Sequence, residues 1–381
     1  MRSTIQVGPT LNPSLLNNYM PTPEPRTGTI SAPTSLNAPV DFFKLVYERF
    51  QKAGGVVSNT VVRDYLIGGL PVRLCFAGNA LVEFITPAFE HLAVPSTESP
   101  LLKICLWDSF STGIAMPSPP WSAEDYRDRG TVRGYNNERI RTSFHMGSGI
   151  LSLLDIKDNI AVWWIRDAAN VPYYESGTPL QAILQWFMGI HNRQYVHAAA
   201  VGTSSGGVLL AGKGGSGKST VATACLFSNL KYAGDDYVLV DVDPSVPVAH
   251  SLYNSVKLND AIFFQFPELT SISCNIQMHD NEKKLLFYYR HFPEKVIESF
   301  PVRAILLPHI THEKNTTIQK VTSAAALAAL APSTIFQLAS AGDDEFRRMS
   351  KFVRKVPAFT LKLGTELSKI PQVILTLLAK V

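Results

Sequence analysis

A glycine-rich segment between two apolar runs is the feature that most limits how this chain can fold. Residues 207–220 read GVLLAGKGGSGKST and satisfy the spacing G-x-x-x-x-G-K-[ST]. The apolar residues before Gly212 predict a strand, and residues 221–226 predict a helix. Because the motif is specific only between a strand and a helix, the segment predicts a phosphate-binding loop in an α/β domain.

Each residue type in this segment has a physical role in holding phosphate. Glycines allow positive φ angles, so successive backbone N–H groups can turn toward an anion, and the following helix adds its N-terminal dipole. Lys218 is expected to reach the β and γ phosphates, and Ser219 to supply a hydroxyl to Mg²⁺. A tight glycine turn that binds nothing is the alternative, and the motif does not distinguish ATP from GTP. The predicted nucleotide-binding residues are Gly212, Gly214, Gly215, Ser216, Gly217, Lys218, Ser219 and Thr220.

Two acidic residues follow the predicted loop at the start of another apolar run. Asp235 and Asp236 stand before the run at 237–240. Phosphoryl transfer needs one carboxylate to hold Mg²⁺ and another to accept the proton of the incoming hydroxyl, and adjacent acids near a phosphate loop can do both. An Asp-rich turn is the alternative. We place His197 on the strand before the loop strand, where a single histidine is by itself better explained as a hydrogen-bonded core residue than as a participant in chemistry.

The order of these features resembles a known family. His197, the 212–219 loop and the pair Asp235 and Asp236 are similar to the catalytic domain of HPr kinase/phosphorylase and its HPr-kinase-like relatives. The likeness covers about residues 190–260, and residues 356–364 look like the closing strand of the stand-alone relatives. The resemblance implies a phosphoenolpyruvate-carboxykinase-like form of the phosphate-loop fold. It also implies that Asp236 is the base for an acceptor serine, that Asp235 lies with the metal, and that His197 lies near the transferred phosphate.

The chain also departs from that family. Bifunctional members carry a Glu-Ile-Arg-Gly segment, whereas the corresponding stretch here, residues 250–258, has neither the glutamate nor the arginine. This difference argues against phosphorylase activity and against HPr as the substrate, and it makes Lys257 a candidate for the missing positive charge. The N-terminal region is more similar to the stand-alone biosynthetic relatives, some of which phosphorylate a serine of a precursor peptide or a small metabolite.

Composition changes along the chain predict three parts. Residues 1–40 hold seven prolines and three charges, which predicts a disordered leader. Residues 41–190 predict an α+β domain rich in antiparallel sheet, and residues 191–381 alternate strand, loop and helix as the kinase-like α/β domain. The first helix is expected to begin with Asp41 as its N-cap.

Apolar runs and turn residues give the expected elements within these parts. Strands are predicted near 61–62, 71–76, 101–107, 150–156 and 160–166, with a hairpin turn at 157–159. Helices are predicted at about 79–92 and at 179–191, the second with Pro179 in its first turn. The C-terminal part adds helices at about 322–330 and 343–354, a strand at 358–363 and a last helix from about 366.

Charge and cysteine usage exclude some partners. The chain has 35 Lys and Arg against 31 Asp and Glu, a net charge of +4, which does not predict binding to nucleic acid or to a membrane surface. It has no apolar run of about 20 residues that could cross a bilayer. Four widely spaced cysteines, with no CxxC pair, fit a reducing cytoplasm. The sequence leaves the oligomeric state open, a homo-oligomer included.

These features support one leading function and two alternatives. The leading hypothesis is an ATP- and Mg²⁺-dependent kinase that transfers the γ phosphate to a hydroxyl, with a serine of a small protein, a precursor peptide or a metabolite as acceptor. A regulatory protein that binds nucleotide without transferring phosphate is the second, and a carboxykinase acting on oxaloacetate is the third. Arg303 is expected either to reach a phosphate or to cap a loop. The pair His309 and His312 lacks the spacing of a metal site.

Overall fold

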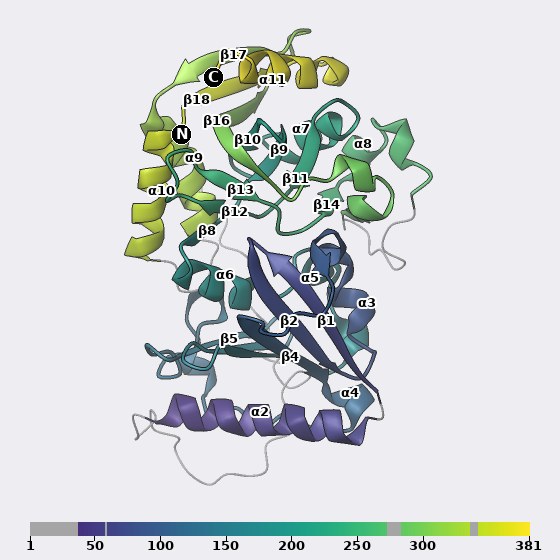
Figure 1. Cartoon of the computed structure of the whole chain (residues 1–381), viewed down its shortest axis with the longest axis vertical. Helices are drawn as coiled ribbons and strands as arrows, with labels where there is room; N and C mark the ends of the chain where they lie inside the picture. Colours follow the sequence, from purple (N-terminus) through teal and green to yellow (C-terminus); the bar gives the residue numbers. More distant parts are fainter. Residues whose placement is uncertain (1–36, 58, 273–282, 336–341) are drawn as a thin grey trace, which may run out of the picture.

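The computed structural model describes residues 37–57, 59–272, 283–335 and 342–381. It is a mixed α/β structure with two large sheets, one formed by the N-terminal part of the chain and one by the C-terminal part (Figure 1). Most of the predicted leader, residues 1–36, lies outside the described residues. No helix in the described ranges has both the length and the apolar character that crossing a membrane requires.

The first sheet has the strand order β3-β1-β2-β4-β7-β6-β5. Four of its pairings are antiparallel, as expected, but β2 with β4 and β4 with β7 are parallel. The sheet is therefore mixed, because helical crossovers and the long excursion through β5 and β6 bring the chain back in the same direction. Its strands are β1 (Thr60–Ile67), β2 (Leu70–Ala77), β3 (Ala93–Val94), β4 (Leu102–Asp108), β5 (Ile140–His145), β6 (Ile150–Asp155) and β7 (Ile160–Ile165).

Helix α2 (Ala38–Val56) covers one face of this sheet (Figure 1). It buries Phe42, Phe43 and Val46 against sheet residues such as Trp107. The helix begins four residues earlier than predicted, with Asn37 at the N-cap in place of Asp41. A proline stands in its first turn, where the missing N–H removes no helical hydrogen bond. The predicted boundary at residue 40 and the predicted N-cap Asp41 are therefore wrong, since Asp41 lies inside the first turn.

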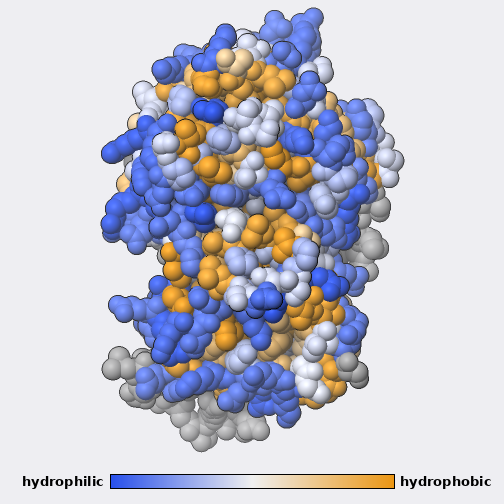
Figure 2. Space-filling model, viewed as in Figure 1, coloured by the Kyte–Doolittle hydropathy of each residue, from blue (hydrophilic) through white to orange (hydrophobic). Residues whose placement is uncertain are grey.

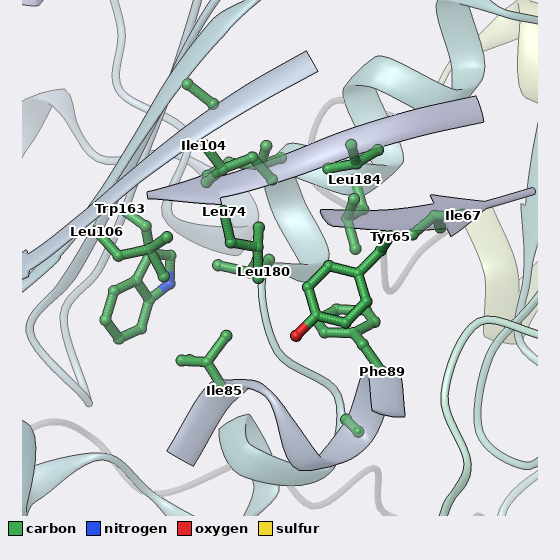
Figure 3. Packing of buried hydrophobic residues seen from close by; sticks show 14 of the residues in the cluster. Tyr65, Ile67, Leu74, Ile85, Phe89, Ile104, Leu106, Trp163, Leu180 and Leu184 are labelled. Carbon is green, nitrogen blue, oxygen red and sulfur yellow. The ribbon is translucent and has the colours of Figure 1, made fainter. Parts of the chain in front are cut away.

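The other face of the first sheet packs against shorter helices (Figure 3). The predicted helix at 79–92 is two pieces, α3 (Val82–Ile85) and the 3₁₀ helix η2 (Pro87–Leu92), because Pro87 cannot continue the hydrogen-bond ladder. The predicted helix at 179–191 is α6 (Gln181–Ile190). Its N-cap is Leu180 in the left-handed region at φ 62°, so Pro179 precedes the cap and does not lie in the first turn.

The second sheet has the order β11-β9-β10-β16-β13-β12-β8. Strand β18 pairs with the C-terminal half of β16, beyond the residues that pair with β13, and it also pairs with β17. A separate two-stranded sheet pairs β14 with β15. The strands are β8 (Arg193–Val196), β9 (Ala199–Thr203), β10 (Gly206–Leu210), β11 (Lys231–Gly234), β12 (Val238–Asp241), β13 (Val248–His250), β14 (Ser255–Leu258), β15 (Lys284–Phe287), β16 (Ser299–Ile310), β17 (Thr317–Val321) and β18 (Ala358–Leu363).

Helices surround the second sheet (Figure 1). The two predicted C-terminal helices at 322–330 and 343–354 and the strand at 358–363 are confirmed, and the last helix follows a short 3₁₀ turn from residue 367. The α-helices of the described chain not yet given bounds are α4 (Ser109–Thr112), α5 (Tyr173–Gly177), α7 (Lys218–Leu226), α8 (Asp260–Phe263), α9 (Ser323–Ile335), α10 (Asp343–Lys355) and α11 (Ile370–Leu378).

The two sheets share part of one hydrophobic core. The molecule narrows where they meet (Figure 2), yet Tyr195, Leu239 and Tyr253 of the second part pack in the same buried cluster as Tyr65 of the first. Polar contacts cross the same junction, since the side-chain amide of Asn254 donates to the carbonyl of Pro87 at 2.8 Å. The two parts are thus positioned against each other by both packing and hydrogen bonds.

Candidate active site

The glycine-rich loop leaves β10 in the middle of the second sheet and enters α7, as predicted. β10 lies between β9 and the parallel strand β16, and the Ala211 N–H continues the pairing to the carbonyl of Leu306 at 2.9 Å. Gly212, Gly215 and Gly217 have positive φ angles, whereas Gly214 does not. At Gly217 φ is 102°, and an added Cβ would stand 2.6 Å from the side chain of Leu363. Only glycine fits there without movement.

Lys218 is the first residue of α7, and its side chain lies inside the loop. The Nζ atom donates to the carbonyl of Gly212 at 2.8 Å and to that of Lys213 at 3.4 Å. Burial lowers the pKa of Lys218, while the charges of Asp235 and Asp236 act in the opposite direction. The ammonium group therefore sits within electrostatic range of both acids and is held by carbonyls that an anionic ligand can replace.

Asp235 lies in the turn between β11 and β12 and is almost completely buried, with 1% exposure. Among the described residues neither carboxylate oxygen has a hydrogen-bond partner with good geometry, although the Ser219 hydroxyl and the Asp236 N–H lie close enough to interact with the carboxylate. Burial, followed by the charge of Asp236, raises the pKa of Asp235 to about 6, whereas Ser219 and Lys218 lower it. Burying a carboxylate that lacks well-formed hydrogen bonds costs folding free energy, and a cation bound at this point would offset that cost.

Asp236 has a different environment from its neighbour. Its backbone is in the left-handed region at φ 63°, which turns the side chain toward β14. The Nζ atom of Lys257 stands 2.8 Å from Oδ2 of Asp236. Burial alone would raise the pKa of Asp236, but the charge and hydrogen bond of Lys257, together with His197 and Lys283, hold that pKa below the ordinary value. The surroundings therefore shift the two adjacent acids in opposite directions: the pKa of Asp235 is raised and that of Asp236 is lowered.

His197 lies near these acids but not on the strand where it was predicted. The run 195–201 is not one strand, because β8 ends at Val196 and β9 begins at Ala199, and the two belong to distant positions in the sheet. His197 occupies the crossing between them, and its N–H donates to the hydroxyl of Thr334 at 3.1 Å. Burial, then Lys218, lowers the pKa of His197 to about 4, so the imidazole is neutral at pH 7.

Sequence analysis did not identify Tyr237, which follows the acidic pair. Its ring centre lies 5.1 Å from that of His197 and 5.0 Å from that of Tyr195. Its position directly after Asp236 was the only sequence signal. Lys257, considered as a replacement positive charge, contacts Asp236 as described above.

A cleft of about 740 Å³ opens beside the loop, on the side that faces β16 and α9. Loop residues 212–216 form one wall, and the C-terminal end of β16 and the helix α9 form the others. The hydroxyl of Ser216, on the wall of this cleft, is buried and has no hydrogen-bond partner among the described residues. We call this space the loop cleft. Its volume is within the range of small-molecule sites.

Other sequence candidates lie away from this site or form no site. Arg303 packs against Gly206 at the opposite end of β10 and donates to the carbonyl of Ser205 at 3.4 Å, which is the loop-capping role. His309 borders the loop cleft, but the described residues contain no group of three His, Cys, Asp or Glu side chains that could hold a metal.

The residues present fit Mg²⁺ of the kind that accompanies nucleotides. Such an ion uses one or two protein ligands and completes its shell with phosphate oxygens and water, so a cluster of three acidic ligands is not needed. The buried carboxylate of Asp235 and the Ser219 hydroxyl, which lies close enough to lower the pKa of Asp235, provide that kind of ligand pair. Thr220 follows in the first turn of α7.

Comparison with known proteins gives little beyond this geometry. No protein-family profile matches the chain, and no curated protein sequence matches it. Among solved structures, the HPr(Ser) kinase/phosphatase from Coxiella burnetii aligns with 49% of this chain and 95% of its own, at 12% identity and a TM-score of 0.29. A TM-score at that level carries no functional argument.

Proposed function

We propose that the protein is an ATP- and Mg²⁺-dependent kinase that transfers the γ phosphate to a hydroxyl group. One observation carries the proposal: beside a glycine loop and its buried lysine, two adjacent carboxylates have opposite environments. Asp235 is buried with no well-formed hydrogen bond from described residues and has a raised pKa, and Asp236 is ionised and paired with Lys257. Metal-assisted phosphoryl transfer to a hydroxyl uses one carboxylate of each kind.

The phosphate groups are assigned to the loop and the start of α7. Backbone N–H groups of residues 212–219 face the β and γ phosphates, and Lys218 exchanges its bond to the Gly212 carbonyl for the phosphate oxygens. Asp235 and Ser219 hold Mg²⁺, which when bound neutralises phosphate charge and orients the phosphates. The loop cleft is large enough for the remainder of the nucleotide.

Asp236 is assigned as the general base. Lys257 contacts its Oδ2, which leaves Oδ1 to face the acceptor. The acceptor oxygen forms a bond to the γ phosphorus, the bond from that phosphorus to the bridging oxygen of ADP breaks, and the hydroxyl proton passes to Asp236. Neutral His197, close to Lys218 and Asp236, donates a hydrogen bond to the transferred group.

The acceptor class follows the sequence resemblance: a serine of a small protein, a precursor peptide or a metabolite. The other function compatible with this site is that of a regulatory protein that binds nucleotide without transferring phosphate. The ion pair between Asp236 and Lys257 favours it, because Lys257 already occupies an oxygen of the proposed base.

The two functions are separated by incubating the full chain with Mg²⁺, γ-labelled ATP and fractionated peptides and metabolites of its host. A kinase produces a labelled species that is absent with Asp236→Asn and present with Asp344→Asn, a control that removes an exposed acid on α10. ATP binding without any labelled product across the fractions would support the regulatory protein and contradict the kinase.

A further inference from the structure

A second cavity, of about 310 Å³, lies where the first sheet meets the candidate active site. Strands β5 and β6, helices α5 and α6 and the ring of Tyr237 enclose it. We call it the polar cavity, because most side chains on its wall carry hydrogen-bonding groups. Its wall consists of Arg129, Ser143, His145, Ile150, Ser152, Tyr174, Glu175, Thr178, Gln181, Ala182, Gln185 and Tyr237.

Arg129 provides the positive end of this cavity. Its backbone is left-handed at φ 63°, and its carbonyl accepts a hydrogen bond from the hydroxyl of Ser143 at 3.2 Å, which fixes the segment over β5. The side chain is exposed and lines the cavity, and its charge acts on the pKa of Tyr237, another residue of the same wall. Among the side chains that the structure places, it forms no ion pair. A guanidinium of this kind is suited to bind a carboxylate through two hydrogen bonds.

Glu175 provides the negative end. Its Oε1 accepts the N–H of Leu180 at 3.3 Å, and it lines the cavity from α5. Burial raises the pKa of Glu175 to about 7, against smaller lowering effects of Leu180, Trp163 and the more distant Lys257. An acid in such surroundings gains from a cation that enters the cavity, because the cation compensates for the lost hydration of the carboxylate.

The remaining wall is neutral and can donate or accept hydrogen bonds. Nδ1 of His145 lies 2.8 Å from the Ser148 hydroxyl and 3.3 Å from the Ser148 N–H, so Ser148 holds this side of the imidazole. Burial lowers the pKa of His145, which keeps it uncharged. Ser143, Ser152 and Thr178 add hydroxyl groups. The cavity therefore has one positive group, one acidic group and neutral donors between them.

We propose that the polar cavity binds a small zwitterion of the α-amino-acid type, with its carboxylate at Arg129 and its ammonium group at Glu175. The cavity volume is near the lower limit of about 300 Å³ for small-molecule sites, which selects one small molecule and excludes a folded protein. An inorganic anion would satisfy Arg129 alone, and a lone cation would satisfy Glu175 alone, whereas a zwitterion satisfies both.

The polar cavity lies next to the acidic pair. Tyr237 forms part of the cavity wall and follows Asp236 directly. On the other side, α5 contacts β14: an added Cβ at Gly177 would stand 3.3 Å from Cε of Lys257, and the Ser255 hydroxyl donates to the carbonyl of Gly177. The binding inference does not depend on kinase activity, since it is measured without nucleotide.

The test is isothermal titration of the full chain with the common free L-amino acids, one at a time, at millimolar concentration. At least one amino acid is expected to bind. Its methyl ester and its N-acetyl derivative are expected to bind at least about tenfold more weakly, because each derivative loses one charge-assisted hydrogen bond. Arg129→Gln and Glu175→Gln are expected to weaken binding by a similar factor, while Arg127→Gln, an exposed arginine outside the cavity wall, leaves it unchanged.

Three results would overturn the proposal, provided that circular dichroism shows the variants folded. The first is that no amino acid binds at millimolar concentration. The second is that the ester and N-acetyl derivatives bind as tightly as the free amino acid. The third is that binding survives Glu175→Gln, in which case Arg129 is a simple anion site, to be checked with inorganic phosphate.

Discussion

Replacing Glu175 by glutamine is predicted to stabilise the ligand-free protein, and to do so more strongly as the pH rises. The pKa of Glu175 is raised from its ordinary value of 4.5 to about 7 by burial, so the native state holds a proton that the unfolded chain has released. The contribution of this group to stability is fully present below pH 4.5 and is lost as the pH rises through 7. Glutamine has the same shape, keeps an oxygen for the Leu180 N–H, and does not titrate.

The magnitude follows from the size of the shift. At 1.36 kcal/mol per pKa unit, the full cost of ionising Glu175 in the native state is about 3 kcal/mol, most of which develops between about pH 5 and pH 8. Because Glu175 keeps some solvent exposure, screening reduces this to about 1–3 kcal/mol.

Urea unfolding of wild type and Glu175→Gln, measured by tryptophan fluorescence at about pH 5 and pH 8, tests this prediction. The difference in unfolding free energy should be small at the lower pH and favour the variant at the higher pH. Glu124→Gln, which removes an exposed glutamate, is the matched control. The reasoning is refuted if the unfolding free energy of the variant minus that of wild type is the same at both pH values. It is also refuted if this difference is smaller at pH 8 than at pH 5.

Three further predictions concern the loop and the acidic pair. Lys218→Ala should remove the rise in thermal midpoint that Mg²⁺ and ATP give the wild type, as seen by differential scanning fluorimetry. Lys257→Met should shift the acid limb of the transfer rate to higher pH, because the pKa of Asp236 is no longer held down; an unchanged profile speaks against this pairing. Gly217→Ala should destabilise by about 1–2 kcal/mol in urea unfolding, whereas Gly214→Ala, which has open space, should not.

The loop and the acidic pair were predictable because their signals are local. The spacing from Gly212 to Ser219 and the flanking apolar runs lie within one strand–loop–helix unit, and α7 begins at Lys218 as the motif requires. The turn that holds Asp235 and Asp236 is equally short. Neighbouring residues determine these elements, so no distant contact was needed to place them.

The position of His197 depends on contacts between distant parts of the chain. The run 195–201 is apolar and reads as a single strand, but β8 pairs with β12 at one edge of the sheet while β9 pairs with β10 and β11 near the other. Strand pairing over such separations leaves no periodic signal in one sequence. The parallel pairings of the first sheet were missed for the same reason.

The polar cavity could not be predicted from the sequence at all. Arg129, Glu175 and Tyr237 are separated by tens of residues and come from three different elements. No spacing rule in the sequence connects an arginine with a left-handed backbone conformation, a glutamate in a short helix and a tyrosine after an acidic turn. Only the packing of the first part of the chain against the second brings them to one space.

The proposed function is tested most directly by measuring ATP affinity and phosphate transfer side by side for wild type and Asp236→Asn. The account predicts that the variant binds Mg²⁺ and ATP, since Lys218, Ser219 and Asp235 remain, and that its transfer to the acceptor is lost. Normal transfer by Asp236→Asn would contradict the assignment of Asp236 as the base and, with it, the mechanism proposed for this site.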